Sequence, residues 1–117
     1  MSYIDGFVIA VPTANKEKFI AHARLGDGVF LDLGAIRVVE CWGDDVPDGK
    51  LTSFPMAVKL KEDETVVFGW IIWPDKATRN AGMEKMMKDP RTQADVNPIP
   101  FDGLRMVFGG FELLVQA

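Results

Sequence analysis

Four segments of the chain are apolar at almost every position, a pattern typical of β-strands that are covered on both faces. β-Branched and aromatic residues are frequent in them, and proline, glycine or polar turn residues lie near their ends. In the third segment the run VVFGWIIW contains no polar side chain. The Gly109-Gly110 pair in the fourth predicts a bend or bulge. The predicted strands are residues 3–11, 36–42, 65–73 and 104–115.

A first helix is predicted between the first two strands, over residues 14–33, where apolar side chains recur at helical spacing. Thr13 is its predicted N-cap, and Gly34 is suited to the position just after its last turn. Gly26 and Gly28 fall inside the helix and predict a kink, because glycine weakens a helix interior.

A second helix is predicted over residues 76–89, after an N-cap at Asp75. It combines small residues with methionines, which suits close packing against a sheet. Residues 50–64 are rich in charge and lack periodicity, so we expect a solvated connection with at most one short helical turn, at residues 56–58.

The predicted order is therefore β-α-β-β-α-β, in one domain over residues 1–117. A weak internal repeat supports two related halves, because two segments each contain an apolar strand, a proline, a capping residue and a helix start. They read FVIAVPTANKEKF and WIIWPDKATRN. Two such units with right-handed crossovers predict an α+β, ferredoxin-like sandwich, in which both helices cover one face of a four-stranded antiparallel sheet.

The second face of that sheet is also apolar, and this predicts a homodimer. Phe68 and Trp70 alternate with Val67, Ile71 and Trp73, so neither face of the strand is polar. Two helices cover only one face. Each large apolar residue left in water would forfeit about 1.5–3 kcal/mol. We therefore expect a twofold partner to pack against the open face and close a dimeric α/β barrel.

Charge and composition exclude several classes of function. The net charge of −4, from 13 basic and 17 acidic residues, argues against nucleic-acid binding, which needs basic patches. We expect no membrane association, because the apolar run at the N-terminus is too short to span a bilayer and has no signal-peptide features. Cys41 is the only cysteine, which excludes an intrachain disulfide and favours the cytoplasm.

Three stretches of the chain carry a resemblance to a known family. They are YIDGFVIAVPTANKEKF, RVVECWGDDVPDGKLTSFPMAVKLKEDETVVFGWIIWP and PFDGLRMVFGGFELL, and ECWGDDVPDGK is the most specific part. In these residues the chain resembles the YbaA-like bacterial family of unknown function, over nearly its whole length. The resemblance implies a dimeric α/β barrel of the ferredoxin-like superfamily, which also contains small monooxygenases, haem-degrading enzymes and stress-response proteins. It implies a cavity between the sheet and the first helix.

His22 and Glu40 are the weak candidates for catalysis in such a cavity. His22 is the only histidine and lies at the margin of the apolar stripe of the first helix, where it could accept a proton or pack as a half-buried side chain; packing is favoured. Glu40 and Arg37 are charged residues in an apolar strand and point to opposite faces, so each needs another partner, such as Arg105 or a residue across the dimer. A structural ion pair is favoured over contact with a ligand.

Trp42 and Trp70 are candidates to line a pocket for a planar molecule, although tryptophans in strands more often belong to the core. Cys41 has no partner in a CxxC motif and is interpreted as a small buried apolar residue. The acidic turn with Asp44, Asp45 and Asp48 lacks the spacing of a calcium loop, so no metal site is predicted. No motif indicates a cofactor.

Four hypotheses on function remain open. The leading one is a cytosolic homodimer with a small hydrophobic pocket that takes a small molecule, of unassigned activity. In the first alternative, which depends on superfamily resemblance, the chain is a monooxygenase-like or isomerase-like enzyme. The others are a non-catalytic ligand-binding or stress-related protein, and a barrel that is filled and has no pocket.

Overall fold

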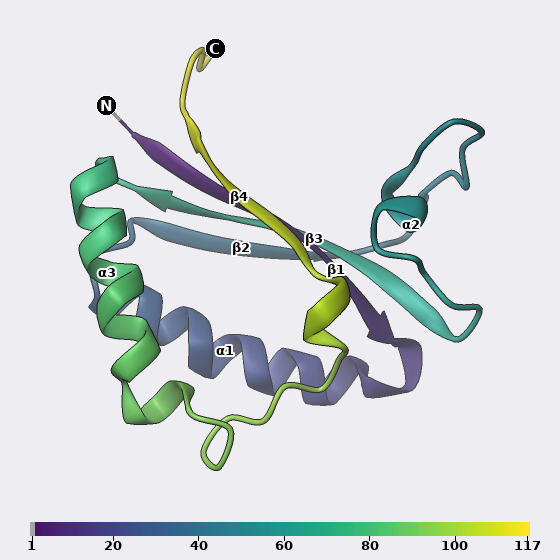
Figure 1. Ribbon diagram of the computed structural model, residues 1–117, viewed down its shortest axis with the longest axis horizontal. Coiled ribbons are helices and arrows are strands. Elements are labelled where there is room, and N and C mark those ends of the chain that lie inside the picture. The colour runs from purple at the N-terminus through teal and green to yellow at the C-terminus, as the bar shows by residue number, and fades with distance from the viewer. Residues whose placement is uncertain (1) are drawn as a thin grey trace.

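The computed structural model describes residues 2–117, which form a four-stranded antiparallel sheet in the order β2-β3-β1-β4. Helices α1 and α3 lie on the same side of this sheet (Figure 1). The predicted ferredoxin-like α+β fold is thus confirmed. The strands and helices are β1 (Tyr3–Pro12), α1 (Lys16–Asp32), β2 (Arg37–Trp42), α2 (Phe54–Ala57), β3 (Glu64–Trp73), α3 (Lys76–Lys88) and β4 (Val107–Glu112), with short 3₁₀ turns at Thr13–Asn15, Pro90–Thr92 and Gly103–Arg105.

The central strands β1 and β3 pair over their full length, from Tyr3 opposite Trp73 to Pro12 opposite Glu64. Phe7 lies opposite Gly69, and a side chain at Gly69 would collide with the Phe7 ring. This strand glycine is therefore required for a close approach. On the other side of β1 the ladder with β4 is regular through Gly109 and Gly110, so the predicted bulge is wrong.

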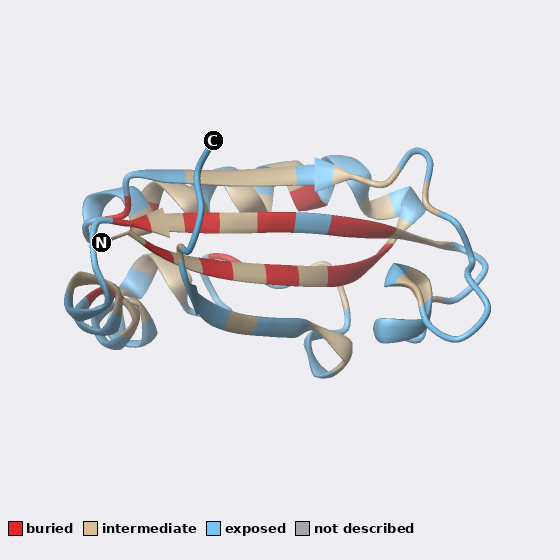
Figure 2. Ribbon diagram, turned by 90° about the horizontal axis from the view of Figure 1, so that it is seen from above, coloured by how far each residue is buried: buried red, intermediate tan, exposed pale blue. Residues whose placement is uncertain are grey.

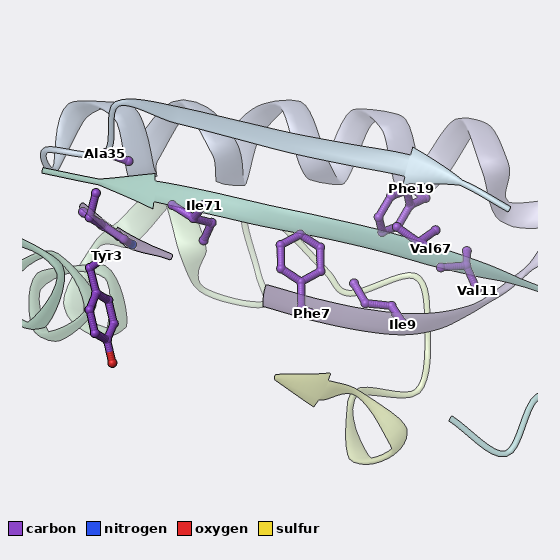
Figure 3. Close-up of a cluster of buried hydrophobic side chains, with 9 residues drawn as sticks. Tyr3, Phe7, Ile9, Val11, Phe19, Ala35, Val67 and Ile71 are labelled. Atoms are coloured by element: carbon purple, nitrogen blue, oxygen red, sulfur yellow. The ribbon is translucent and has the colours of Figure 1, made fainter. Parts of the chain in front are cut away.

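Hydrophobic side chains from β1, β3 and α1 form a core between the sheet and the helices. Figure 3 shows Phe7 and Ile9 of β1, Val67 and Ile71 of β3 and Phe19 of α1 in this cluster. Trp73 ends β3 and is fully buried. Helix α3 approaches it closely because the position facing the ring is Gly82, where an added Cβ would lie 2.7 Å from the indole.

Helix α1 departs from its prediction at two points. It continues without interruption through Gly26 and Gly28, so the predicted kink is absent there. Packing of Val29, which is fully buried, and of Phe19 outweighs the low helix propensity of glycine. Thr13 does not cap the helix: it lies in a 3₁₀ turn, and its hydroxyl hydrogen-bonds to that of Thr65 at 2.7 Å.

Other predicted helix ends are confirmed. Gly34 follows the last turn of α1 with φ +113°, a conformation that favours glycine. Asp75 caps α3, and its Oδ1 accepts a hydrogen bond from the backbone N–H of Thr78 at 2.7 Å. None of the helices in residues 2–117 has the length and apolar character that crossing a membrane requires.

The face of the sheet opposite the helices is only partly covered, as the view onto that face in Figure 2 shows. At one end the segment around α2 folds over it, and fully buried Val58 packs against Ala10 and Val66. Residues 50–64 are otherwise largely exposed, as their charge predicted, and Val58 is the one buried position among them. Phe68 contacts Phe54 of α2 and stays partly exposed, and Val107 and Phe111 of β4 remain exposed beyond this cover.

Candidate functional site

A cavity of about 540 Å³ lies between the sheet and the helices. Its walls come from the inner faces of β1, β2 and β3, from α1 and α3, and from the segment between α3 and β4. Most of the lining is apolar, with Phe7, Phe19, Phe30, Phe101 and Phe108 contributing aromatic rings. A cavity of this size, with few polar groups, is typical of sites for small molecules.

Glu40 and Asp27 form a hydrogen-bonded pair of carboxyl groups in the cavity wall. Glu40 points toward the helices because it lies opposite Gly69 in the β2–β3 ladder, on the face that Phe7 also occupies. Asp27 reaches it from α1. Burial raises the pKa of Glu40 to about 9, and the hydrogen bond and charge of Asp27 act in the same direction. Burial also raises the pKa of Asp27.

His22 precedes Asp27 on α1 and is held by Asn97. His22 Nδ1 is 2.9 Å from Asn97 Oδ1, and Asn97 Nδ2 donates to the backbone carbonyl of His22 at 3.1 Å. Asn97 is buried and lies in the segment that joins α3 to β4. The His22 ring also packs edge-on against Phe101, with 5.8 Å between ring centroids. His22 lowers the pKa of Asp27 through its charge, so the two side chains are close.

A second polar cluster, Asp5, Arg79 and Trp73, lines another part of the cavity wall. Arg79 Nη2 donates to Asp5 Oδ1 at 2.9 Å, and Arg79 Nε donates to both carboxylate oxygens at 3.2 and 3.1 Å. Trp73 Nε1 donates to Asp5 Oδ2 at 2.9 Å. The hydrogen bonds that Arg79 donates to the Asp5 carboxylate raise the pKa of Arg79. Both oxygens of Asp5 are thus occupied by protein donors, as a buried carboxylate requires.

Of the residues that the sequence singled out, the structure brings His22 and Glu40 together in the cavity. The partner of Glu40 is Asp27, and not the arginine that an ion pair predicted. Arg105 lies outside the cavity lining, where it pairs with Glu64 at 2.6 Å and also contacts Asp102. Arg105 is in the 3₁₀ turn before β4, and its side chain reaches Glu64, the first residue of β3.

The remaining three candidates also lie outside this cavity lining. Arg37 is exposed on the open face of the sheet, because it lies opposite Ile72. Trp70 lies on the same face and contacts Phe68, with 5.6 Å between ring centroids. Trp42 packs at the edge of the core, with the Lys16 ammonium 5.4 Å from its ring.

Cys41 is exposed on the open face, which corrects the expectation that it is buried. Alternation along β2 puts it on the side away from the helices. Among residues 2–117 no three histidine, cysteine or acidic side chains are grouped as metal ligands would be.

Sequence reasoning missed Asp27 and Asn97. Asp27 lies in the Gly-Asp-Gly segment that predicted a kink, although its position four residues after Ala23 and three before Phe30 puts it on the apolar stripe of a continuous helix. Asn97 lies 75 residues from His22 in a loop rich in proline, and no local pattern connects the two.

Comparison with known proteins places this chain in a family. Residues 2–103 match the family described as "Protein of unknown function (DUF1428)". The chain belongs to this family. It is 50% identical over 116 residues to the uncharacterized protein YbaA of Escherichia coli strain K12, with 99% of each chain covered, and equally so to YbaA of Shigella flexneri.

Among solved structures, the chain is similar to a mutant form of SnoaB, described as a cofactor-independent oxygenase from Streptomyces nogalater. The TM-score is 0.56 with 13% sequence identity, over 98% of this chain and 95% of that one. At this identity the likeness supports the ferredoxin-like fold that this family member adopts.

Proposed function

We propose that the protein is a cytoplasmic homodimer that binds a small, largely apolar molecule in the cavity beside Glu40 and His22. The observation that supports binding is the combination of an apolar cavity of about 540 Å³ with a few polar groups, at Glu40, Asp27 and His22. Apolar walls supply affinity, and a small number of polar groups orient the molecule.

Binding is testable with bicyclic probes of matched shape, such as the hydrocarbon tetralin and the ketone 2-tetralone. A probe at 100 times its dissociation constant stabilises the protein by about 2.7 kcal/mol, which thermal unfolding detects. Ala23→Leu puts extra volume into the cavity and should abolish the shift, whereas Ala21→Leu, on the exposed side of the same helix, should keep it. Equal shifts in both variants would contradict binding in this cavity.

The homodimer is supported by the open face of the sheet. Phe68 on β3 and Val107 and Phe111 on β4 are 43%, 44% and 62% exposed, and they lie on the same face of the sheet on either side of β1. A second copy of the chain presents the same apolar face, so a twofold contact would bury both together. Sedimentation equilibrium should find a dimer. Phe111→Glu should give monomers, while Leu104→Glu, at a position 97% exposed in a 3₁₀ turn, should remain dimeric.

A second candidate function is catalysis without a bound cofactor. SnoaB, which shares the fold, is described as a cofactor-independent oxygenase. Two observations favour catalysis over simple binding here: a carboxyl group with a raised pKa, and a histidine held by a buried amide. Turnover of a bound compound that is lost in His22→Ala, with binding retained, would distinguish an enzyme from a binding protein.

A further inference from the structure

We infer that the polar part of the cavity is an acid–base site for an uncharged, largely apolar ketone. In this site His22 removes a proton from the carbon next to the carbonyl, and Glu40 donates a hydrogen bond to the carbonyl oxygen. The inference deepens the proposed function, because the same cavity must first bind the ketone.

Asn97 determines which nitrogen of His22 is free. The Nδ2 of Asn97 donates to the carbonyl oxygen of His22, which can only accept, and this orients the amide with Oδ1 toward His22 Nδ1. An amide oxygen can only accept, so the neutral imidazole carries its hydrogen on Nδ1. Nε2 therefore holds the lone pair of a base. Asn97 is a positioning residue, since it acts through His22.

The carboxyl pair supplies the hydrogen-bond donor. Two hydrogen-bonded carboxyl groups share a proton, since both being ionised would leave two negative charges in contact. Glu40 keeps it at neutral pH because its pKa is raised to about 9. The Glu40 O–H can then turn from Asp27 toward a ligand oxygen, as a neutral acid does in an apolar site.

The charges that face the cavity select an uncharged ligand. The titratable groups are Asp27, Glu40 and His22 in one cluster, of which only Asp27 is charged when His22 is a neutral base, and Asp5 and Arg79 in the other. Arg79 and Asp5 cancel one another, and Arg79 is already bound to both oxygens of Asp5. A ligand carboxylate would therefore meet Asp27 without a free cation, which is costly in an apolar cavity.

The chemical step balances without an oxidant or cofactor. The C–H bond beside the carbonyl breaks and its proton forms an N–H bond at His22 Nε2. The electron pair moves onto the carbonyl oxygen, which becomes an enolate that accepts the hydrogen bond from Glu40. The negative charge of Asp27 stabilises the imidazolium. Return of the proton to the same carbon gives exchange, and its delivery to the far carbon of a conjugated enolate gives an isomer.

Solvent exchange tests this step directly, with 2-tetralone as the probe. In D₂O the α-hydrogens of 2-tetralone are replaced by deuterium, and proton NMR follows their loss. The wild-type homodimer should accelerate exchange at least about 100-fold over His22→Gln, the usual range for a positioned base. Glu40→Gln should lower the rate about tenfold, because an amide is a weaker donor to an enolate than a carboxylic acid. Ala21→Leu should exchange like the wild type.

The position of the proton on His22 is measurable by itself. His22 is the only histidine, so a protein labelled with ¹⁵N-histidine and freed of any purification tag gives one imidazole. Its nitrogen shifts should report hydrogen on Nδ1 in the wild type. In Asn97→Leu the two tautomers should mix and exchange should slow, and Asn97→Gln, which keeps an amide, should recover part of the rate. Hydrogen on Nε2 in the wild type would overturn the assignment of the base.

The outcomes separate the two proposals. If tetralin and 2-tetralone both bind and exchange stays at the buffer rate, the acid–base inference fails while the binding function stands. If neither compound shifts the unfolding temperature and exchange equals that of His22→Gln, both fail. Exchange that is equal in wild type, Glu40→Gln and His22→Gln, with 2-tetralone bound, would also overturn the inference.

Discussion

Two carboxyl clusters face the same cavity, and they are neutralised in opposite ways. Asp5 is surrounded by protein donors: Arg79 binds both of its oxygens, and Trp73 is a second partner. Glu40 is instead paired with a second acid, Asp27, and only a shared proton relieves the repulsion. The first cluster has its bonding capacity filled by the fold. The second keeps a proton that it can offer to a ligand, and this difference separates a structural site from a chemical one.

The largest expected loss of stability comes from disrupting the cluster of Asp5, Arg79 and Trp73. Asp5→Ala leaves the Arg79 guanidinium partly buried without its carboxylate and removes the acceptor of the Trp73 N–H. Removing one partner of a buried ion pair costs about 3–5 kcal/mol, so the free energy of unfolding in urea should fall by that amount. Asp45→Ala, at an exposed position, should change it by less than about 0.5 kcal/mol. A loss of the same small size for Asp5→Ala would show that the cluster contributes little.

Glu40→Gln should instead raise the free energy of unfolding, and the size of this gain should depend on pH. The pKa of Glu40 is raised in the folded state, from an ordinary value of 4.5 to about 9, so the folded protein binds this proton more tightly than the unfolded chain. Its contribution to stability is full below pH 4.5 and is lost as the pH rises toward 9. The neutral amide of the variant avoids this loss.

The variant should therefore match the wild type near pH 4.5 and exceed it near pH 9. Because Glu40 is only half-buried, solvent screening reduces the difference to roughly 2 kcal/mol. Urea unfolding at several pH values measures it, with Glu84→Gln on the exposed surface of α3 as a flat control. A variant that is less stable than the wild type at every pH would indicate that Glu40 is ionised and bound to a donor.

Among the three variants of the two clusters, Arg79→Lys should change the free energy of unfolding least. Lysine keeps the charge but lacks the planar fork that places Nε and Nη2 on the two oxygens of Asp5. We expect a loss of about 1 kcal/mol of unfolding free energy, the usual net value of one hydrogen bond. Ligand-binding shifts with tetralin should stay unchanged, since this cluster has no role in holding the molecule. A change in tetralin affinity larger than the change in stability would assign Arg79 to the binding site.

Local patterns predicted the fold because they depend on neighbouring residues. Alternation along a strand and the cap at Asp75 act over a few positions, and the β-α-β-β-α-β order then leaves few arrangements of the sheet. Local preference failed where packing opposed it, as at Gly26 and Gly28, which stay helical in α1. In residues 50–64 the charges correctly indicated solvent exposure, but they gave no sign that Val58 is fully buried.

The candidate site depended on the tertiary structure. His22 was conspicuous in the sequence as the only histidine, and Glu40 as a carboxylate in an apolar strand. Neither position shows that Glu40 meets Asp27, or that Asn97 holds His22 from 75 residues away. Such pairs form when strand register and helix packing bring distant side chains within about 3 Å, a distance that no short-range pattern encodes. The sequence by itself determined the strands, the helices and their order. The packing of α1 against β2 decided which carboxyl groups share a proton, and the packing of the α3–β4 segment against α1 decided which nitrogen of His22 is free.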